Sequence, residues 1–268
     1  MRTICTRAFA LCIGVTALAG PSVAAPCGAD FGSWLAEFQG EAVAKGISQQ
    51  TVMSALAGVT PDPKVLSLDR NQRVFKQSFE EFSQNRIAGR LQKGQRMMLQ
   101  YGSMLSRIEE QFGVPGSIVI AIWGLETDFG VVMGKQSAIR SLVTLAHDCR
   151  RTDRFQAELM DALRIIDRGD LSAAEMRGAW AGELGQTQFL PSSYVKFAVD
   201  FDGDRRRDLI RSVPDVLAST ANYLRGYGWK RGGGWNEGSE NFEVLKEWNK
   251  SSVYQKTIAL FATQLDGP

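Results

Sequence analysis

Apolar side chains recur at helical spacing in the first part of the chain. Phe31, Trp34 and Phe38 fall three or four residues apart, which is the spacing of one face of an amphipathic helix. The prolines within residues 59–63 separate this helix from the next. No sustained alternation of apolar and polar residues follows, so strands are expected to be few and short, beside a cleft or near residues 240–246. The pattern therefore predicts a mainly α fold.

A run without ionisable side chains stands near the middle of the sequence. Residues 118–125 are apolar or glycine, which predicts a helix buried on every side. Glu126 follows directly, one turn beyond Ile122, and Gly130 is well placed to end the helix. Burial should raise the pKa of Glu126, and a carboxyl group that keeps its proton near neutral pH can act as a general acid. The alternative is a helix-end glutamate paired with an arginine such as Arg140, and this segment alone leaves both interpretations open.

The segment 177–194 is rich in glycine and in amide side chains, and it turns into a helix at Pro191. Glycines let a backbone approach a ligand closely, and glutamine side chains can bind sugar hydroxyl and acetamido groups. The same composition also suits a tight packing loop without a ligand. The residues of this segment therefore allow a binding role but do not establish one.

The first 25 residues form a separate unit. Two arginines precede an apolar run at residues 9–19, and small residues then allow cleavage after Ala24 or Ala25. The apolar run is too short to span a bilayer comfortably. We expect a cleavable signal peptide at residues 1–25, a periplasmic or secreted protein and no membrane anchor; an uncleaved N-terminal anchor is the alternative.

Composition and charge narrow the class of partner. The chain has 268 residues, 44% of them hydrophobic and 22% charged, which is ordinary for a globular protein. Loss of Arg2 and Arg7 with the signal peptide lowers the 31 basic residues to 29, equal to the 29 acidic residues. A neutral protein without a basic run gives no support to a nucleic-acid partner or to an anionic membrane surface.

Histidine and cysteine limit the chemistry further. His147 is the one histidine, which excludes zinc sites built on two histidines and leaves any Ser-His-Asp triad dependent on it. It follows an apolar stretch, where a packed or surface histidine is the simpler interpretation. Cys27 and Cys149 remain after processing and can either pair as a disulfide in an oxidising compartment or stay as free thiols.

Several motifs in fixed order resemble the lytic murein transglycosylase B family. They occupy residues 117–130, 177–194, 198–204, 218–224, 228–229 and 248–252. The resemblance covers essentially the whole mature chain, and it implies a lysozyme-like catalytic core within an elongated, largely helical molecule. We expect an N-terminal helical part at residues 26–107 and a catalytic region at residues 108–268 that ends in a closing helix.

The resemblance also implies roles for single residues. Glu126 corresponds to the catalytic glutamate of the family, and Gln188 corresponds to the glutamine that contacts the glycan. Asn249 and Tyr254 match an asparagine and a tyrosine that line the cleft, and Trp248 stands where the family has an aromatic ring suited to stacking on a sugar. These assignments follow from the resemblance and not from composition or spacing.

The implied activity is cleavage of the β-1,4 bond between N-acetylmuramic acid and N-acetylglucosamine in peptidoglycan, with formation of a 1,6-anhydro end. One carboxyl group suffices as acid and then base, and no cofactor is required for the chemistry. The expected partner is the glycan strand, and the expected state is a monomer. Two alternatives are a hydrolytic muramidase that uses a second carboxylate such as Glu183, and a catalytically silent wall-binding protein.

An acidic segment at residues 200–215, within the expected catalytic region, is spaced like an EF-hand loop. Its first, third and fifth positions are Asp200, Asp202 and Asp204. In the family such a loop binds calcium and a later aspartate closes the site, for which Asp215 is the nearest match. The loop departs from the pattern because Arg205 occupies the glycine position and Arg211 replaces the bidentate glutamate. A structural calcium site and a metal-free acidic turn are both open.

Overall fold

The computed structural model describes residues 27–28, 30–71 and 77–267. Helices dominate, and their order is α1(Phe31–Ala44), α2(Gln49–Ala55), α3(Pro63–Arg70), α4(Phe79–Ile87), α5(Leu91–Gln100), α6(Gly102–Phe112), α7(Gly116–Thr127), α8(Ala138–His147), α9(Thr152–Asp167), α10(Pro191–Phe197), α11(Val213–Gly226), α12(Glu240–Trp248) and α13(Ser252–Asp266). The two strands are β1(Gln136–Ser137) and β2(Arg177–Gly178), which pair antiparallel. The expected signal peptide, residues 1–25, lies outside the described residues.

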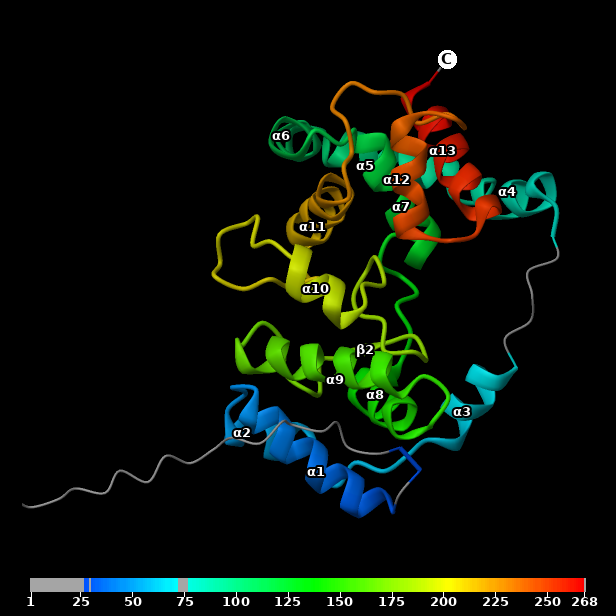
Figure 1. The fold of residues 1–268 in the computed structure, drawn as a ribbon. Coiled ribbons are helices and arrows are strands. Elements are labelled where there is room, and N and C mark those ends of the chain that lie inside the picture. Colours follow the sequence, from blue (N-terminus) through cyan, green and yellow to red (C-terminus); the bar gives the residue numbers. More distant parts are fainter. Residues whose placement is uncertain (1–26, 29, 72–76, 268) are drawn as a thin grey trace, which may run out of the picture.

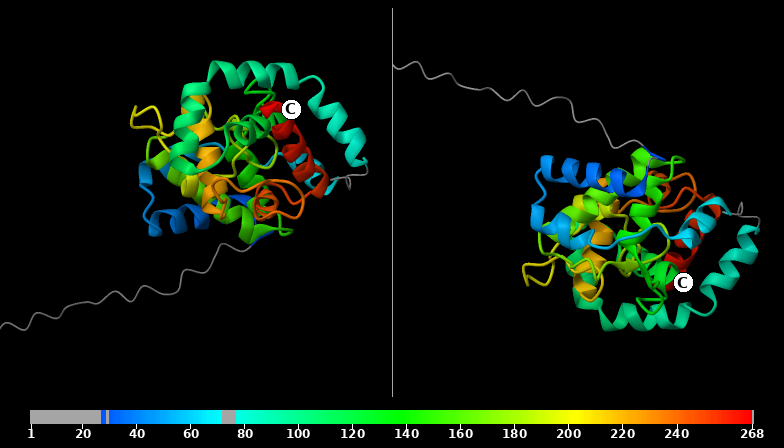
Figure 2. Two further views of the ribbon diagram at one scale, coloured as in Figure 1. Left: turned by 90° about the horizontal axis from the view of Figure 1, so that it is seen from above. Right: turned by 90° about the horizontal axis from the view of Figure 1, so that it is seen from below.

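The helices form two groups (Figure 1). The lower group contains α1–α3 with α8 and α9, and the upper group contains α4–α7 with α11–α13. Helix α10 packs on both α9 and α11 and so joins the groups. We expected residues 26–107 to form one N-terminal part. In the structure, α1–α3 belong to the lower group, whereas α4–α6 belong to the upper group and curve around its outside (Figure 2).

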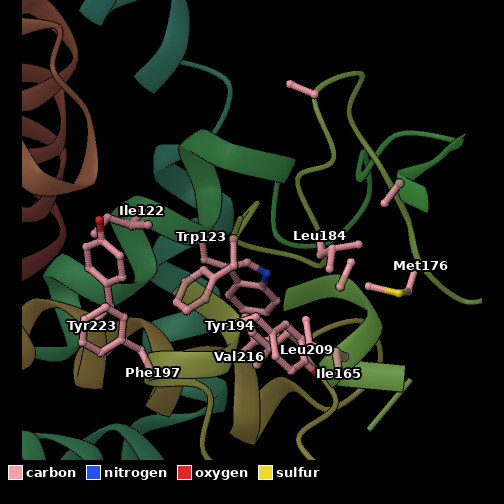
Figure 3. Close-up of a cluster of buried hydrophobic side chains, with 14 of the residues drawn as sticks. Ile122, Trp123, Ile165, Met176, Leu184, Tyr194, Phe197, Leu209, Val216 and Tyr223 are labelled. Carbon is pink, nitrogen blue, oxygen red and sulfur yellow. The ribbon is translucent and has the colours of Figure 1, made fainter. Parts of the chain in front are cut away.

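Helix α7 is the centre of the upper group. Every residue from Gly116 to Leu125 is buried, as the uninterrupted apolar run predicts. Each fully buried isoleucine of this helix contributes about 1.5–3 kcal/mol relative to an exposed one. Figure 3 shows Ile122 and Trp123 among buried side chains of neighbouring elements such as Leu184 and Val216. The helix ends at Thr127, and Asp128, whose φ of 52° is left-handed, forms its C-cap in place of the expected Gly130.

The lower group starts at a well-capped helix. The Asp30 carboxylate accepts a hydrogen bond from the Ser33 N–H and so caps α1. Trp34, Phe38 and Ala42, four residues apart, are fully buried. This face of α1 confirms the helical spacing on which the sequence interpretation rests.

Strand content is small, as expected. The only paired strands of the described residues hold the loop after α7 against the segment after α9. Residues 240–246, where a strand was one expectation, belong to α12. Ser239 caps this helix by accepting from the Phe242 N–H, and this local signal outweighs the β-branched Val244.

Cys27 and Cys149 form a disulfide, with Cα atoms 5.0 Å apart. The bond joins the segment before α1 to the turn between α8 and α9, across 122 residues of sequence. The sequence allowed either a disulfide or two free thiols, and the structure contains the disulfide. Among the described residues, no helix combines the length and the apolar character needed to cross a membrane.

Candidate active site

A cavity of about 580 Å³ lies where the two groups of helices meet. The end of α7, the start of α9, the segment 179–190, and the ends of α11 and α12 each contribute to its wall. Its wall includes four charged or amide residues that the sequence analysis singled out, namely Glu126, Glu183, Gln188 and Asn249. Trp248 lies beside them, so the fold brings together segments from distant parts of the chain.

Glu126 sits in the last turn of α7, where the helix meets this cleft. Its Oε1 atom accepts two hydrogen bonds, from the Trp248 indole N–H at 2.9 Å and from the Tyr254 hydroxyl at 2.8 Å. Among the described residues, no donor reaches Oε2. The two oxygens of this carboxyl group are therefore in different environments, one fixed by the protein and one left for a ligand.

Burial raises the pKa of Glu126 above its usual value. The hydrogen bonds from Trp248 and Tyr254 act in the opposite direction, because they stabilise the carboxylate, and the charge of Arg86 does the same. The negative charge of Glu183 adds to the rise. Burial has the largest effect, so Glu126 keeps its proton at higher pH than an exposed glutamate. This is the property that a general acid needs.

Gln188 also lines this cleft, and its side chain is held by hydrogen bonds to the backbone. Its φ of 55° is left-handed, and its side-chain amide donates to the carbonyl oxygens of Gly185 at 2.8 Å and Met133 at 3.2 Å. Both N–H bonds of the amide are thus used within the protein, and its carbonyl oxygen is the group left to accept a hydrogen bond from a ligand.

Asn249 and Trp248 follow the end of α12. The Asn249 side-chain oxygen accepts from the Ser251 N–H at 2.9 Å, which leaves its amide N–H groups for a ligand. Trp248 packs edge-on against Tyr223, with ring centroids 4.9 Å apart, and against Phe189 at 5.6 Å. With its N–H on Glu126, this ring is fixed as part of the wall around the acid.

A family model described as "Transglycosylase SLT domain" matches residues 30–239. The chain belongs to this family. It is 39% identical over 134 residues to the membrane-bound lytic murein transglycosylase B of Escherichia coli (strain K12), a match over 50% of this chain and 37% of that protein. The match thus spans well under half the length of this curated relative.

Solved structures of SLT-type proteins share the fold. SltB3 from Pseudomonas aeruginosa, in complex with NAG-anhNAM-pentapeptide, superposes with a TM-score of 0.85 and 32% identity over 90% of this chain and 80% of that chain. Escherichia coli Slt35 in complex with calcium gives a TM-score of 0.77 at 24% identity, over 87% and 92% of the two chains. The prediction of a mainly α fold with a lysozyme-like core is confirmed.

Two residues of this SLT chain tie α7 to the segment that carries Gln188. The Trp123 indole N–H donates to the Gln186 side-chain oxygen at 2.9 Å, and the Thr127 hydroxyl donates to the Gln186 carbonyl oxygen at 2.5 Å. Both are buried. Sequence reasoning missed these contacts, because neither Trp123 nor Thr127 carries a local signal of a partner about 60 residues away.

The cleft also holds charged residues from the lower group. Arg151 and Arg154 line it beside the Phe155 ring, with guanidinium carbons 4.9 and 5.6 Å from the ring centroid. Buried Asp69 of α3 forms ion pairs with Arg151 and Arg150. Arg140, considered as a partner for Glu126, lies elsewhere and pairs with Asp62.

Glu183 enters the same cleft from the segment between β2 and α10. Its carboxylate accepts from the Ala181 N–H at 3.0 Å. Burial raises the pKa of Glu183, while the charge of Arg154 lowers it and that of Glu158 raises it. A second carboxyl group therefore lies in the cleft of Glu126, and it too favours its neutral form.

The acidic loop lies outside the cleft. Oxygen atoms of Asp200, Asp202 and Asp204 lie within 4.8 Å of one another, a set that suits a hard cation. Asp215, the expected closing ligand, accepts from the N–H groups of Phe201 and Asp208 with its two oxygens, and its role as a ligand stays a prediction. Arg205 adopts a φ of 72° at the position that normally takes glycine, a strained conformation for an arginine.

Proposed function

We propose that this chain is a lytic transglycosylase, which cleaves the β-1,4 bond between N-acetylmuramic acid and N-acetylglucosamine in peptidoglycan and leaves 1,6-anhydro ends. The observation that carries the proposal is the carboxyl group of Glu126, with one oxygen fixed by Trp248 and Tyr254 and the other directed to the cleft. Membership of the SLT family and the likeness to SltB3 support it.

The hydrogen bonds decide where the transferable proton resides. Two donors point at Oε1 of Glu126, so this oxygen must accept and cannot carry the proton. In the neutral acid the proton is therefore on Oε2, the atom without a protein donor. Burial keeps Tyr254 neutral by raising its pKa well above the usual value, so it remains a donor throughout.

The reaction then needs only this carboxyl group. Oε2 gives its proton to the glycosidic oxygen while the bond from that oxygen to the muramic acid C1 breaks, and positive charge develops at C1. The substrate's own 2-acetamido group can stabilise this charge. The Glu126 carboxylate next takes the proton of the muramic acid 6-hydroxyl, whose oxygen bonds to C1. The attack is intramolecular and gains in effective concentration, and no water is consumed.

The glycan contacts proposed for the neighbouring residues follow from their free groups. Gln188 retains a carbonyl oxygen that can accept from a sugar hydroxyl, and Asn249 retains amide N–H groups that can donate to an acetamido oxygen. Tyr254 and Trp248 act on the acid itself. Because the Trp248 ring is packed edge-on and its N–H is used, we assign it to the Glu126 environment and not to an open stacking platform.

Hydrolysis by Glu183 is the second candidate, because this carboxyl group shares the cleft. A base that activates water must be ionised, whereas burial raises the pKa of Glu183. The test is mass analysis of peptidoglycan sacculi digested with the mature protein. Anhydro ends, lighter by one water than hydrolysed ends, support the proposal. Hydrolysed ends alone would assign the chain to the muramidases, and absence of cleavage with retained binding would make it a wall-binding protein.

Export by a cleavable signal peptide, action as a monomer on the glycan and the lack of a membrane anchor are part of the proposal. The Cys27–Cys149 disulfide supports an oxidising compartment, because such bonds persist outside the reducing cytosol. Fractionation of cells that express the full chain, with N-terminal sequencing, tests this. A product that retains residues 1–25 in the membrane fraction would contradict it.

We also propose a structural calcium ion at Asp200, Asp202 and Asp204, whose carboxylates suit the oxygen preference of calcium. The ion would stabilise the loop and take no part in bond cleavage. A ligand that binds only the folded state raises the melting temperature by mass action. A melting temperature unchanged by calcium and by chelator, with no heat of binding in calorimetry, would leave the loop as a metal-free acidic turn.

A further inference from the structure

A second cavity of about 490 Å³ lies at the opposite end of α7 from Glu126. Ser117 in its wall and Glu126 are nine residues apart on this helix, which is about 14 Å along the axis. The wall combines the end of α5, one side of α6, the start of α7, the glycine-rich loop between α11 and α12 (residues 227–239) and the end of α13. Figure 1 shows where these helices lie. Its size falls within the range of small-ligand sites.

One wall offers hydrogen-bond donors. Helix α7 begins at Gly116 after Pro115, and no side chain caps it. The Pro115 carbonyl accepts from the Ile118 and Val119 N–H groups, so the N–H groups without an intrahelical partner are those of Gly116 and Ser117. Ser117 is 1% exposed, and its hydroxyl has no partner among the described residues. Buried hydroxyl groups are normally hydrogen-bonded. This wall therefore lacks an acceptor that a ligand carbonyl group could supply.

The facing side has the opposite character. Glu109 of α6 and Asp266 of α13 line the cavity with exposed carboxylates, which can only accept hydrogen bonds when ionised. Trp235 lines the same cavity and is half-buried, and its N–H donates to the Thr263 hydroxyl at 3.2 Å. No aromatic ring of the described residues stacks on the Trp235 ring.

The glycine-rich loop is held in place before any ligand binds. Asn241 is 1% exposed, and its side chain bonds the Lys230 N–H at 2.7 Å, the Lys230 carbonyl at 3.0 Å and the Gly233 carbonyl at 2.9 Å. Arg231 donates to the Glu110 carbonyl oxygen and ties the loop to α6. A preformed wall lowers the entropy cost of binding.

We propose that this cavity is a second, non-catalytic site for an N-acetylated sugar. The acetamido carbonyl group would accept from the α7 N–H groups and from Ser117, and sugar hydroxyl groups would donate to Glu109 and Asp266. The apolar face of the sugar ring would pack on Trp235. The two carboxylates oppose a phosphate or another anion. The residues of the wall indicate an N-acetylated sugar as the ligand. That this sugar belongs to a glycan polymer rests on the proposed function.

Such a site would hold a second stretch of polymer while Glu126 acts on the first. Tethering raises the local concentration of substrate without changing the chemistry, so it affects polymeric and not short substrates. The binding test is calorimetry with N,N′-diacetylchitobiose on the whole mature chain carrying Glu126→Gln, alone and with Trp235→Ala or Glu109→Gln added. Glu110→Gln is the matched control, since Glu110 is the exposed neighbour that does not line the cavity.

We expect Trp235→Ala to remove one equivalent of disaccharide binding, Glu109→Gln to weaken it and Glu110→Gln to leave it unchanged. Identical isotherms for the Glu126→Gln protein with and without Trp235→Ala would overturn the proposal. Trp235→Ala in the active chain should also slow release from insoluble sacculi by about threefold to tenfold, at an unchanged rate on soluble muropeptides. Equal effects on both substrates would also overturn it. A parent that binds the disaccharide here but cuts neither substrate would instead refute the proposed function.

Discussion

At the residue scale, proton transfer by Glu126 can be tested without changing the shape of its side chain. Glu126→Gln keeps the shape of the side chain, and its amide oxygen can still accept from Trp248 and Tyr254. We expect release of anhydro-muropeptides to fall by at least about 10²–10⁴-fold, because an amide cannot transfer the proton. A folded Glu126→Gln protein with near-native turnover would remove this residue from the mechanism.

The same substitution should change the pH dependence of stability. The folded-state pKa of Glu126 is raised, so below the unfolded-state value both states are protonated and the residue has no effect. As pH rises through and above the unfolded-state value, the unfolded chain ionises more readily and the fold loses stability. Glu126→Gln should therefore raise the melting temperature relative to the parent near neutral pH and leave it unchanged at pH below about 4.

Tyr254 lowers the pKa of Glu126 by donating to its carboxylate. We expect Tyr254→Phe to move the alkaline fall of the pH–rate profile to higher pH, by roughly one to two units for a hydrogen bond to a charged group. Tyr227→Phe is the control, since Tyr227 does not line the cleft. A shift to lower pH would contradict the assignment of Tyr254 as a donor.

Glu183 acts in the opposite direction, because its negative charge raises the pKa of Glu126. Glu183→Gln should move the alkaline fall to lower pH, by less than about one unit, while the products stay anhydro-muropeptides. The rates of the parent and of Glu183→Gln should differ only at pH values where Glu183 itself is ionised. An unshifted profile would mean that the two carboxyl groups do not interact. Loss of hydrolysed ends on substitution would instead favour the water mechanism.

At the element scale, the contact between α7 and the following segment sets the position of Gln188. The Thr127 hydroxyl donates to the Gln186 carbonyl and accepts from the Gly130 N–H at 2.9 Å, and Thr127 is 1% exposed. Thr127→Val should lower the free energy of unfolding by about 1–3 kcal/mol, because it leaves buried polar groups unpaired. Denaturant unfolding measures this. Ser54→Ala, which removes an exposed hydroxyl, should cost less than about 0.5 kcal/mol.

The sequence pattern predicted those elements whose burial is visible in a single run of residues. The run 118–125 identified a fully buried helix with a carboxylic acid at its end, because burial on every side leaves no polar positions. The two donors to Oε1 of Glu126 could not be predicted in this way. Tyr254 was placed in the cleft only through the family resemblance, and Trp248 was expected to stack on a sugar and not to donate to the acid. An indole that donates to an acid and one that stacks on a sugar look identical in sequence.

The arginines of the cleft had no sequence signal at all. Arg151 and Arg154 occupy ordinary positions at the start of an amphipathic helix, where a solvated face is the simplest interpretation. Their place in the cleft depends on how α9 packs against α10 and on the ion pairs of buried Asp69. Such long-range packing cannot be derived from periodicity, which describes only one element at a time.

At the scale of the whole molecule, the disulfide fixes the start of the chain to the lower group. Replacing both Cys27 and Cys149 by serine frees a segment that is otherwise closed over 122 residues. We expect the free energy of unfolding to fall by about 2–4 kcal/mol, or by less because Cys27 would lie near the terminus of the proposed mature chain. Thiol counting on the unfolded, unreduced mature parent is the check. Two free thiols would show that the pair does not form in solution.

The order of assembly has a consequence for when cutting can begin. The donors that hold Oε1 of Glu126, Trp248 and Tyr254, follow it by 122 and 128 residues and belong to the last two helices. In the proposed export, with the amino end first, Glu126 emerges well before either donor. Until α12 and α13 are in place, Oε1 of Glu126 lacks both of its donors. Under the proposed function, the carboxyl group therefore acquires its catalytic environment only when these two helices have folded into place.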